Sequence, residues 1–380
     1  MLMSNLDEME PAFARIVERR AAARLLPPYS ARSPQFVMDA LTRFFAIERP
    51  GAHVDDIRRM GGGASKEQFL FTLKGVHDRA EKFVLRMDPR AAITETDRRR
   101  EYELLNLVQG LIPAPKPMWL DADGLHFNQP AMIMEFVRGV TKPSDSSLTV
   151  SGLGTFLGER LRGQLKAPFL EYLVKIHAID WRVADLPTFD APVADPQQAA
   201  RWSLNYWVAM WNIDKSEERP IFSLTTQWLR DNLPDCNDLV MTHGDYRTGN
   251  YLFDEKEGQI TAILDWELAR IGDYHEDLGW FLMQLFGIFE NGDFRAGDLY
   301  GREDFIKAYE LSSGRTVNRR TLHFYDVMAS WKCYIITAAN GLGAARDSHN
   351  HQDVLLTFLS STAALFADDM CRLLSQESPQ

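Results

Sequence analysis

Asp245, Asn250 and Asp265 are the residues whose types and spacing best suit chemistry in this chain of 380 residues. Asn250 lies five residues after Asp245, and Asp265 follows fifteen residues later, at the end of an apolar run. Phosphoryl transfer from Mg-ATP needs one carboxylate to orient a hydroxyl group, and an amide oxygen and a second carboxylate to hold the metal. Both expected ligands are hard oxygens, which magnesium prefers. The spacing therefore indicates a phosphoryl-transfer site.

Ordinary turn formation is the competing interpretation, because Asp and Asn are common in glycine-containing loops. The match is more specific here, since His243 precedes Asp245 and apolar strands flank the loop. A hairpin with its turn at 255–258 would bring Asn250 and Asp265 together. These coincidences favour the functional interpretation.

The run His243-Gly-Asp-Tyr-Arg-Thr-Gly-Asn250 and the run 264–278 (LDWELARIGDYHEDL) together resemble the aminoglycoside phosphotransferase family. The run 264–278 is especially similar to the branch of kinase-like domains found fused to acyl-CoA dehydrogenases, and the family resemblance covers roughly residues 50–370. It implies a bilobed protein-kinase-like fold. It also implies a catalytic base, two magnesium ligands and two residues that brace the catalytic loop: Asp245, then Asn250 and Asp265, then His243 and Asp277.

The distribution of strands and helices predicts an α+β chain with a small antiparallel-sheet N-lobe and a larger, mainly helical C-lobe. We expect an N-terminal helical extension at 1–50, a nucleotide-binding N-lobe at 51–137 and a C-lobe at 138–380 that holds the catalytic loop, metal and acceptor site. Helices are expected over 11–24, from Ser33-Pro34 onward and over 94–109, with Thr94 as N-cap.

A glycine-rich turn between two predicted strands is the candidate cover for the ATP phosphates, and it comprises Gly61, Gly62, Gly63, Ala64 and Ser65. It is not a P-loop, because Gly-Lys-Ser/Thr does not follow the glycines. Alone it is equally typical of a plain hairpin turn. Its place at the start of the N-lobe favours nucleotide binding.

A buried cation on a strand should be held by a glutamate on the next helix. Leu104, Leu105 and Val108 place Glu101 on the inward helix face, where a lone carboxylate would be costly. Arg86 stands where the family usually has lysine, and Lys82, on the same strand face, is a competitor. We expect Arg86 to contact the phosphates.

The strand over 130–137 should link the lobes, and the resemblance implies that the backbone at Glu135 and Val137 binds the adenine edge. Glu267 could assist the metal or brace Arg247, and the sequence does not decide between these roles.

Composition is that of a soluble globular protein, with 45% hydrophobic and 25% charged residues. The net charge of −11 argues against nucleic-acid binding, and no apolar stretch of membrane-span length is expected. Three scattered cysteines and an acidic N-terminus favour a cytoplasmic location.

The predicted function is ATP- and Mg²⁺-dependent phosphorylation of a hydroxyl group on a small molecule. Two alternatives stay open: an inactive kinase-like module that binds nucleotide or a partner, and a metal-dependent hydrolase using His243, Asp245 and Asp265. Neither the acceptor nor the oligomeric state follows from the sequence.

Overall fold

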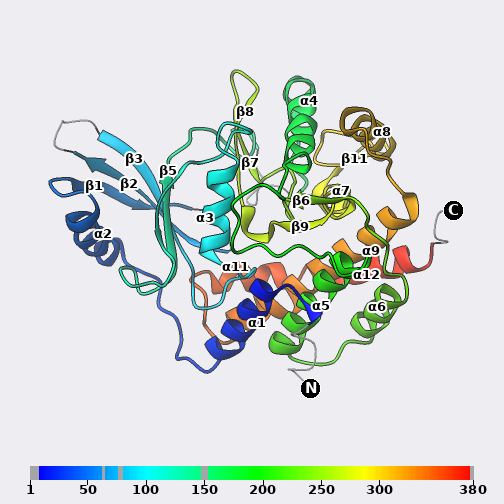
Figure 1. Cartoon of the computed structure of the whole chain (residues 1–380), viewed down its shortest axis with the longest axis horizontal. Coiled ribbons are helices and arrows are strands. Elements are labelled where there is room, and N and C mark those ends of the chain that lie inside the picture. The colour runs from blue at the N-terminus through cyan, green and yellow to red at the C-terminus, as the bar shows by residue number, and fades with distance from the viewer. Residues whose placement is uncertain (1–7, 62–64, 76–79, 147–152, 377–380) are drawn as a thin grey trace.

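A small sheet-rich lobe and a larger helical lobe make up the chain in this computed structural model, which describes residues 8–61, 65–75, 80–146 and 153–376 (Figure 1). The small lobe holds an antiparallel sheet in the order β1-β2-β3-β5-β4. Its strands are β1 (His53–Arg59), β2 (Glu67–Lys74), β3 (Ala80–Met87), β4 (Pro117–Asp121) and β5 (Ala131–Glu135). The α+β, two-lobed arrangement is thus as predicted.

Both faces of this sheet are covered, which explains the nearly continuous apolar run of β2. Phe69 and Phe71 pack with α2 (Pro34–Glu48) on one face. Leu70, which points the other way, belongs to the core that includes Leu104 of α3 (Arg98–Leu107). Helix α3 is thereby fixed over the sheet with its N-terminal turn near the second lobe (Figure 1).

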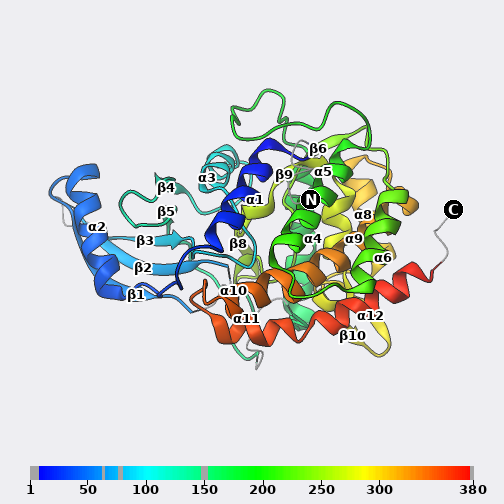
Figure 2. The ribbon, with the colours of Figure 1, turned by 90° about the horizontal axis from the view of Figure 1, so that it is seen from below.

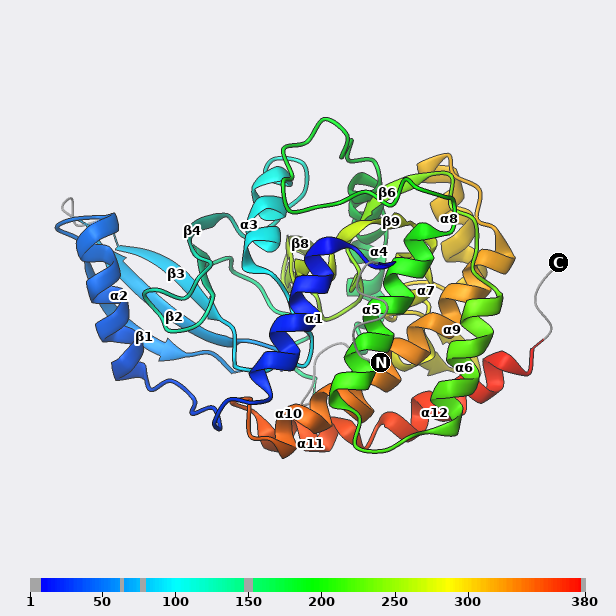
Figure 3. The ribbon, with the colours of Figure 1, turned by 60° about the horizontal axis from the view of Figure 1, so that its bottom comes forward.

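The two helices of the segment 1–50 pack on different lobes. Helix α2 begins at Pro34, and the Ser33 hydroxyl accepts a hydrogen bond from the Phe36 N–H at 3.1 Å. Helix α1 (Pro11–Ala23) instead lies along α5 of the large lobe, as Figures 2 and 3 show. Its Phe13 ring contacts the Tyr206 ring at a centroid distance of 4.7 Å. The division at residue 50 remains a proposal.

The large lobe is mainly helical, with three short strand pairs. Its α-helices are α4 (Gly158–His177), α5 (Gln198–Asp214), α6 (Pro220–Asp231), α7 (His275–Phe281), α8 (Arg302–Ser313), α9 (Arg319–Ile335), α10 (Leu342–Arg346), α11 (Asp353–Ser360) and α12 (Ala363–Leu374). Shorter helices are η2 (Trp266–Leu268), η3 (Gln284–Phe286) and the π-helical η4 (Ile336–Gly341). The strand pairs are β6 (Leu239–Thr242) with β9 (Arg270–Asp273), β7 (Tyr251–Asp254) with β8 (Gln259–Ile263), and β10 (Ile288–Glu290) with β11 (Asp293–Arg295).

Two local expectations are wrong. Helix α3 begins at Arg98 rather than near Thr94, because the Asp97 carboxylate accepts from the Arg99 N–H at 2.9 Å and caps it. The segment Asp353–Leu374 is long and apolar enough, by length and composition alone, to span a membrane, although no such stretch was expected. It consists of the two helices α11 and α12, and Phe366 and Met370 are buried in the core of the large lobe.

Candidate active site

The turn that follows β6 is held in place by hydrogen bonds to a buried carboxylate. Asp277, near the N-terminus of α7, accepts hydrogen bonds from the backbone N–H of His243 at 2.8 Å and of Gly244 at 2.7 Å. Gly244 has a φ of +80°, and a Cβ there would lie 2.5 Å from the Leu268 carbonyl oxygen. The contact expected between Asp277 and this loop is therefore present, and glycine is required beside it.

His243 joins the two loops that carry the predicted site residues. Its Nδ1 accepts from the Asp245 N–H at 3.2 Å, and its Nε2 lies 2.9 Å from the Leu264 carbonyl oxygen. Burial lowers the pKa of His243 below its ordinary 6.5, so the ring is neutral. An accepting Nδ1 and a carbonyl beside Nε2 place the single proton on Nε2.

The Asp245 carboxylate is oriented through one of its two oxygens. Oδ1 accepts from Arg247 Nε at 2.9 Å and from Trp280 Nε1 at 2.6 Å. The side chain keeps 20% of its surface exposed, and Oδ2 has no hydrogen-bond partner among the described residues. Oδ2 is therefore the oxygen that can accept a proton or a hydrogen bond from a hydroxyl group.

Asn250 and Asp265 are brought side by side by the β7–β8 hairpin, as the sequence predicted. The Asn250 amide nitrogen donates to the Asp245 carbonyl at 2.9 Å, which leaves its oxygen for a cation. The Leu264 N–H donates to the Asn250 carbonyl at 2.8 Å. Asp265 has a φ of +60°, an uncommon conformation for a residue other than glycine and one often found at functional sites.

Arg86 connects the lobes at this point. Its Nη1 lies 2.9 Å from Glu101 Oε1, and its Nη2 lies 2.9 Å from Asp265 Oδ1. Arg86 is buried in β3, whereas Lys82 is exposed at the far end of that strand. The structure therefore brings Arg86, and not Lys82, to the carboxylates. Arg98 also pairs with Glu101, through the other carboxylate oxygen.

Lys66 is a site residue that the sequence analysis missed. It is 1% exposed, and its Nζ lies 3.3 Å from Asp88 Oδ1 and 3.5 Å from Glu267 Oε2. Its only sequence signal is its position between the glycine turn and β2, where a solvated lysine is equally typical. Glu267 also accepts from the hydroxyl groups of Ser65, at 2.9 Å, and Thr94. Glu267 therefore ties the small lobe to the metal-ligand segment, and within the described residues no hydrogen bond or ion pair joins it to Arg247, which bonds to Asp245 instead.

The pKa values of the two carboxylates in this segment, Asp265 and Glu267, are shifted in opposite directions. Burial disfavours the charge on Glu267, but Lys66, Arg86 and Arg98 outweigh it and lower the pKa of Glu267. Burial raises the pKa of Asp265; Arg86 opposes this rise, and the nearby carboxylates of Glu267 and Asp245 add to it. A divalent cation beside Asp265 would relieve this unfavourable environment for its charge.

The remaining predicted residues would contact the nucleotide through their backbone rather than through their side chains. Gly61 and Ser65 frame the glycine turn, whereas Gly62, Gly63 and Ala64 lie outside the described residues. Glu135 ends β5, with its N–H bonded to the Lys116 carbonyl at 2.9 Å. The N–H of Val137 has no partner within the described ranges, so it can donate to a ligand.

The donor set fits magnesium. Asn250 and Asp265 supply two hard oxygens, the number typical of sites where phosphate oxygens and water complete the coordination. Among the residues that the structure describes, no three His, Cys, Asp or Glu side chains form a metal-binding group. Nothing in this part of the chain thus supports the hydrolase alternative.

Comparison with known proteins agrees with this geometry. A family model described as "Phosphotransferase enzyme family" matches residues 56–311. Acyl-CoA dehydrogenase family member 10 of Mus musculus is 26% identical over 226 residues, which are 57% of this chain and 20% of that protein. Family member 11 of Homo sapiens is 26% identical over 211 residues, 54% of this chain and 26% of that protein. The matched region thus spans only about a fifth to a quarter of these relatives.

Solved structures show the same fold. A Ralstonia eutropha protein assigned as an aminoglycoside phosphotransferase superposes with a TM-score of 0.65 at 20% identity, covering 88% of this chain and 97% of that one. Macrolide 2'-phosphotransferase type I gives a TM-score of 0.55 at 17% identity, covering 92% and 100%. The predicted kinase-like fold is confirmed.

Proposed function

Because this chain belongs to the phosphotransferase enzyme family, we propose that it transfers the γ-phosphoryl group of ATP, in the presence of Mg²⁺, to a hydroxyl group of a small molecule. One observation carries the proposal. The chain brings an oriented carboxylate, Asp245, next to Asn250 and Asp265, and a buried Arg86 held by Glu101 reaches the same point.

Each side chain has a distinct role in this proposal. Asp245 Oδ2 accepts the hydrogen bond of the acceptor hydroxyl and aligns its oxygen for in-line attack. The Asn250 amide oxygen and the Asp265 carboxylate would hold Mg²⁺, which neutralises phosphate charge when bound. Arg86 contacts phosphate oxygens with the N–H groups that Glu101 and Asp265 leave free.

The nucleotide is bound mainly by backbone. The turn from Gly61 to Ser65 covers the phosphates, and the backbone at Glu135 and Val137 contacts the adenine edge. Support comes from Ser65, whose hydroxyl bonds to Glu267, and from the unpartnered N–H of Val137. His243 and Asp277 keep the catalytic loop in position. A cytoplasmic location is part of the same proposal.

Arg247 favours a negatively charged acceptor. Its guanidinium bonds to Asp245 and lies 4.7 Å from the centre of the Phe286 ring, beside the oxygen that would receive the hydroxyl. The N–H groups that Asp245 and Thr248 leave free can donate to a carboxylate or phosphate group of an acceptor. A hydroxyacyl-CoA thioester, whose CoA portion carries phosphate groups, fits this requirement and is in keeping with the acyl-CoA dehydrogenase relatives.

The deciding experiment measures ATP binding by calorimetry, with and without Mg²⁺, in wild type, Asp265→Ala and Asp245→Ala. We expect Mg²⁺-dependent binding in wild type, its loss in Asp265→Ala and its retention in Asp245→Ala. Asp123→Ala, at an exposed carboxylate paired only with Arg99, is the matched control.

An acceptor screen follows, and Asp245→Ala should lose transfer by about three orders of magnitude or more. Unchanged ATP affinity in Asp265→Ala would contradict the metal assignment. Tight ATP binding without transfer to any hydroxyl compound would favour the inactive-module alternative.

A further inference from the structure

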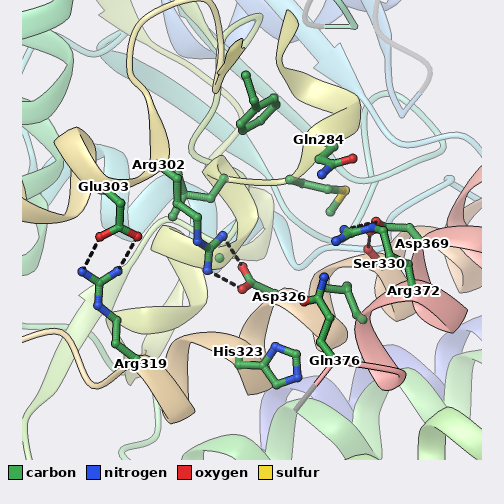
Figure 4. A pocket seen from close by; sticks show the side chains of 15 residues that line it. Gln284, Arg302, Glu303, Arg319, His323, Asp326, Ser330, Asp369, Arg372 and Gln376 are labelled. Carbon is green, nitrogen blue, oxygen red and sulfur yellow. Dashed lines mark hydrogen bonds and ion pairs between the residues drawn. The ribbon is translucent and has the colours of Figure 1, made fainter. Parts of the chain in front are cut away.

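A cavity of about 410 Å³ lies in the large lobe, between α7, α8, α9 and α12 (Figure 4). None of the candidate active-site residues lines it. Gly279 and Met283 form part of its wall, and neighbouring Trp280 contacts Asp245. The volume is within the range of small-molecule sites.

Three guanidinium groups from three helices line this cavity, and each is paired with one carboxylate (Figure 4). Arg319 makes two bonds to Glu303, at 3.0 and 2.7 Å. The other two pairs are Arg302 with Asp326, and Arg372 with Asp369.

Hydrogen-bond donors are in excess around the cavity. Each guanidinium has five N–H donors, about fifteen in all, and the three pairs use six of them. The carboxylate of Asp369 is also occupied, since it accepts from the Ser330 hydroxyl. A ligand that supplies acceptor oxygens therefore matches this wall better than one that supplies donors.

His323 lines the same cavity and is buried without a partner. It is 5% exposed, and neither ring nitrogen has a hydrogen-bond partner in the described part of the chain. Figure 4 shows its ring below the Arg302–Asp326 pair. Burial lowers the pKa of His323, and Arg302 and Arg372 lower it further.

We propose that this cavity binds a small organic anion, a carboxylate or a phosphate ester, through His323 and the free N–H groups of Arg302 and Arg372. The cavity also has apolar lining residues, which can accommodate a hydrocarbon portion of the ligand. The apolar part of the lining comprises Leu282, Met283, Phe294 and Leu373. Entry of the anion leaves the three carboxylates bonded to their own arginines, because each guanidinium has donors to spare.

The test observes His323 directly, by the NMR titration of its Cε1–H proton, assigned by its absence in His323→Gln. Charged groups from three helices line the cavity with this ring, and a change in any of them can shift the pKa of His323. They are Arg302 and Glu303 from α8, Arg319 and Asp326 from α9, and Asp369 and Arg372 from α12. Inorganic phosphate and succinate serve as probes at constant ionic strength.

We expect either anion to raise the pKa of His323 by about one unit, because a bound negative charge favours the imidazolium. The probe that acts at the lower concentration identifies the phosphate or the carboxylate as the preferred class. A His323 resonance insensitive to both anions up to about 20 mM would overturn the proposal.

Variants separate a built site from general attraction of anions. Arg372→Ala, at a side chain that is 40% exposed, should weaken the response about tenfold, whereas Arg99→Ala, 50% exposed in the small lobe, should leave it unchanged. Arg302→Gln removes the guanidinium group that pairs with Asp326 and should weaken the response to the anion more strongly than Arg372→Ala does. Equal responses in Arg372→Ala, Arg99→Ala and wild type would also refute the assignment, whatever the outcome for ATP binding.

Discussion

Asp277 offers a quantitative test of how the catalytic loop is held. Its carboxylate is fully buried and accepts from the N–H groups of His243 and Gly244, and His177 Nε2 lies 3.0 Å away. Asp277→Ala leaves two buried backbone donors unpaired, each worth about 1–3 kcal/mol. We therefore expect the free energy of unfolding to fall by about 4 kcal/mol, the middle of that range for two donors.

Asp277→Asn should lower the free energy of unfolding by a smaller amount. The amide oxygen can still accept one N–H, while the amide nitrogen faces the other donor, so a loss of about 2 kcal/mol is expected. Urea unfolding measures both values, with Asp123→Ala, whose carboxylate is 67% exposed, as a control that should change little. A phosphotransfer assay should show lower activity in both Asp277 variants, since Asp245 follows Gly244 directly.

The pH dependence of the same variants has a definite sign. Burial disfavours the charge on Asp277, but its bond to His177 and the other nearby donors prevail and lower its pKa below 3.8. The ionised carboxylate thus stabilises the fold above that pH, and the contribution is lost as the pH falls toward the lowered value. A loss below about 1 kcal/mol in Asp277→Ala would refute the role of this carboxylate.

Two further substitutions probe the site. Lys66→Met removes the cation between Asp88 and Glu267 and should cost about 3 kcal/mol in urea unfolding, whereas exposed Lys82→Met should cost almost nothing; equal costs would contradict the buried pair. Because His243 is buried neutral with its pKa below 6.5, wild-type stability should fall as the pH drops below 6.5, by up to about 1.4 kcal/mol per unit. His243→Gln should show a flatter profile over that window, and identical pH profiles would exclude the ring as the source.

Local pattern was sufficient where burial follows periodicity along one element. The apolar stripe of α3 placed Glu101 inward, and Arg86 faces it from β3, one residue before the strand ends, so their ion pair was predictable. The same reasoning says nothing about Glu103 of that helix, which accepts from the Thr188 N–H and hydroxyl. A helix pattern reveals its inward face and does not reveal a loop that crosses its outer side.

The sequence by itself indicated the class of chemistry, because the spacing of Asp245, Asn250 and Asp265 coincides with His243 and with flanking apolar strands. It also determined the α+β division, since strand and helix periods are local properties. Only the tertiary structure decided that Arg86 reaches Asp265, 179 residues away, and that Trp280 orients Asp245. Such contacts depend on how the lobes and helices pack, and this packing sums many weak apolar contacts that leave no motif in the chain.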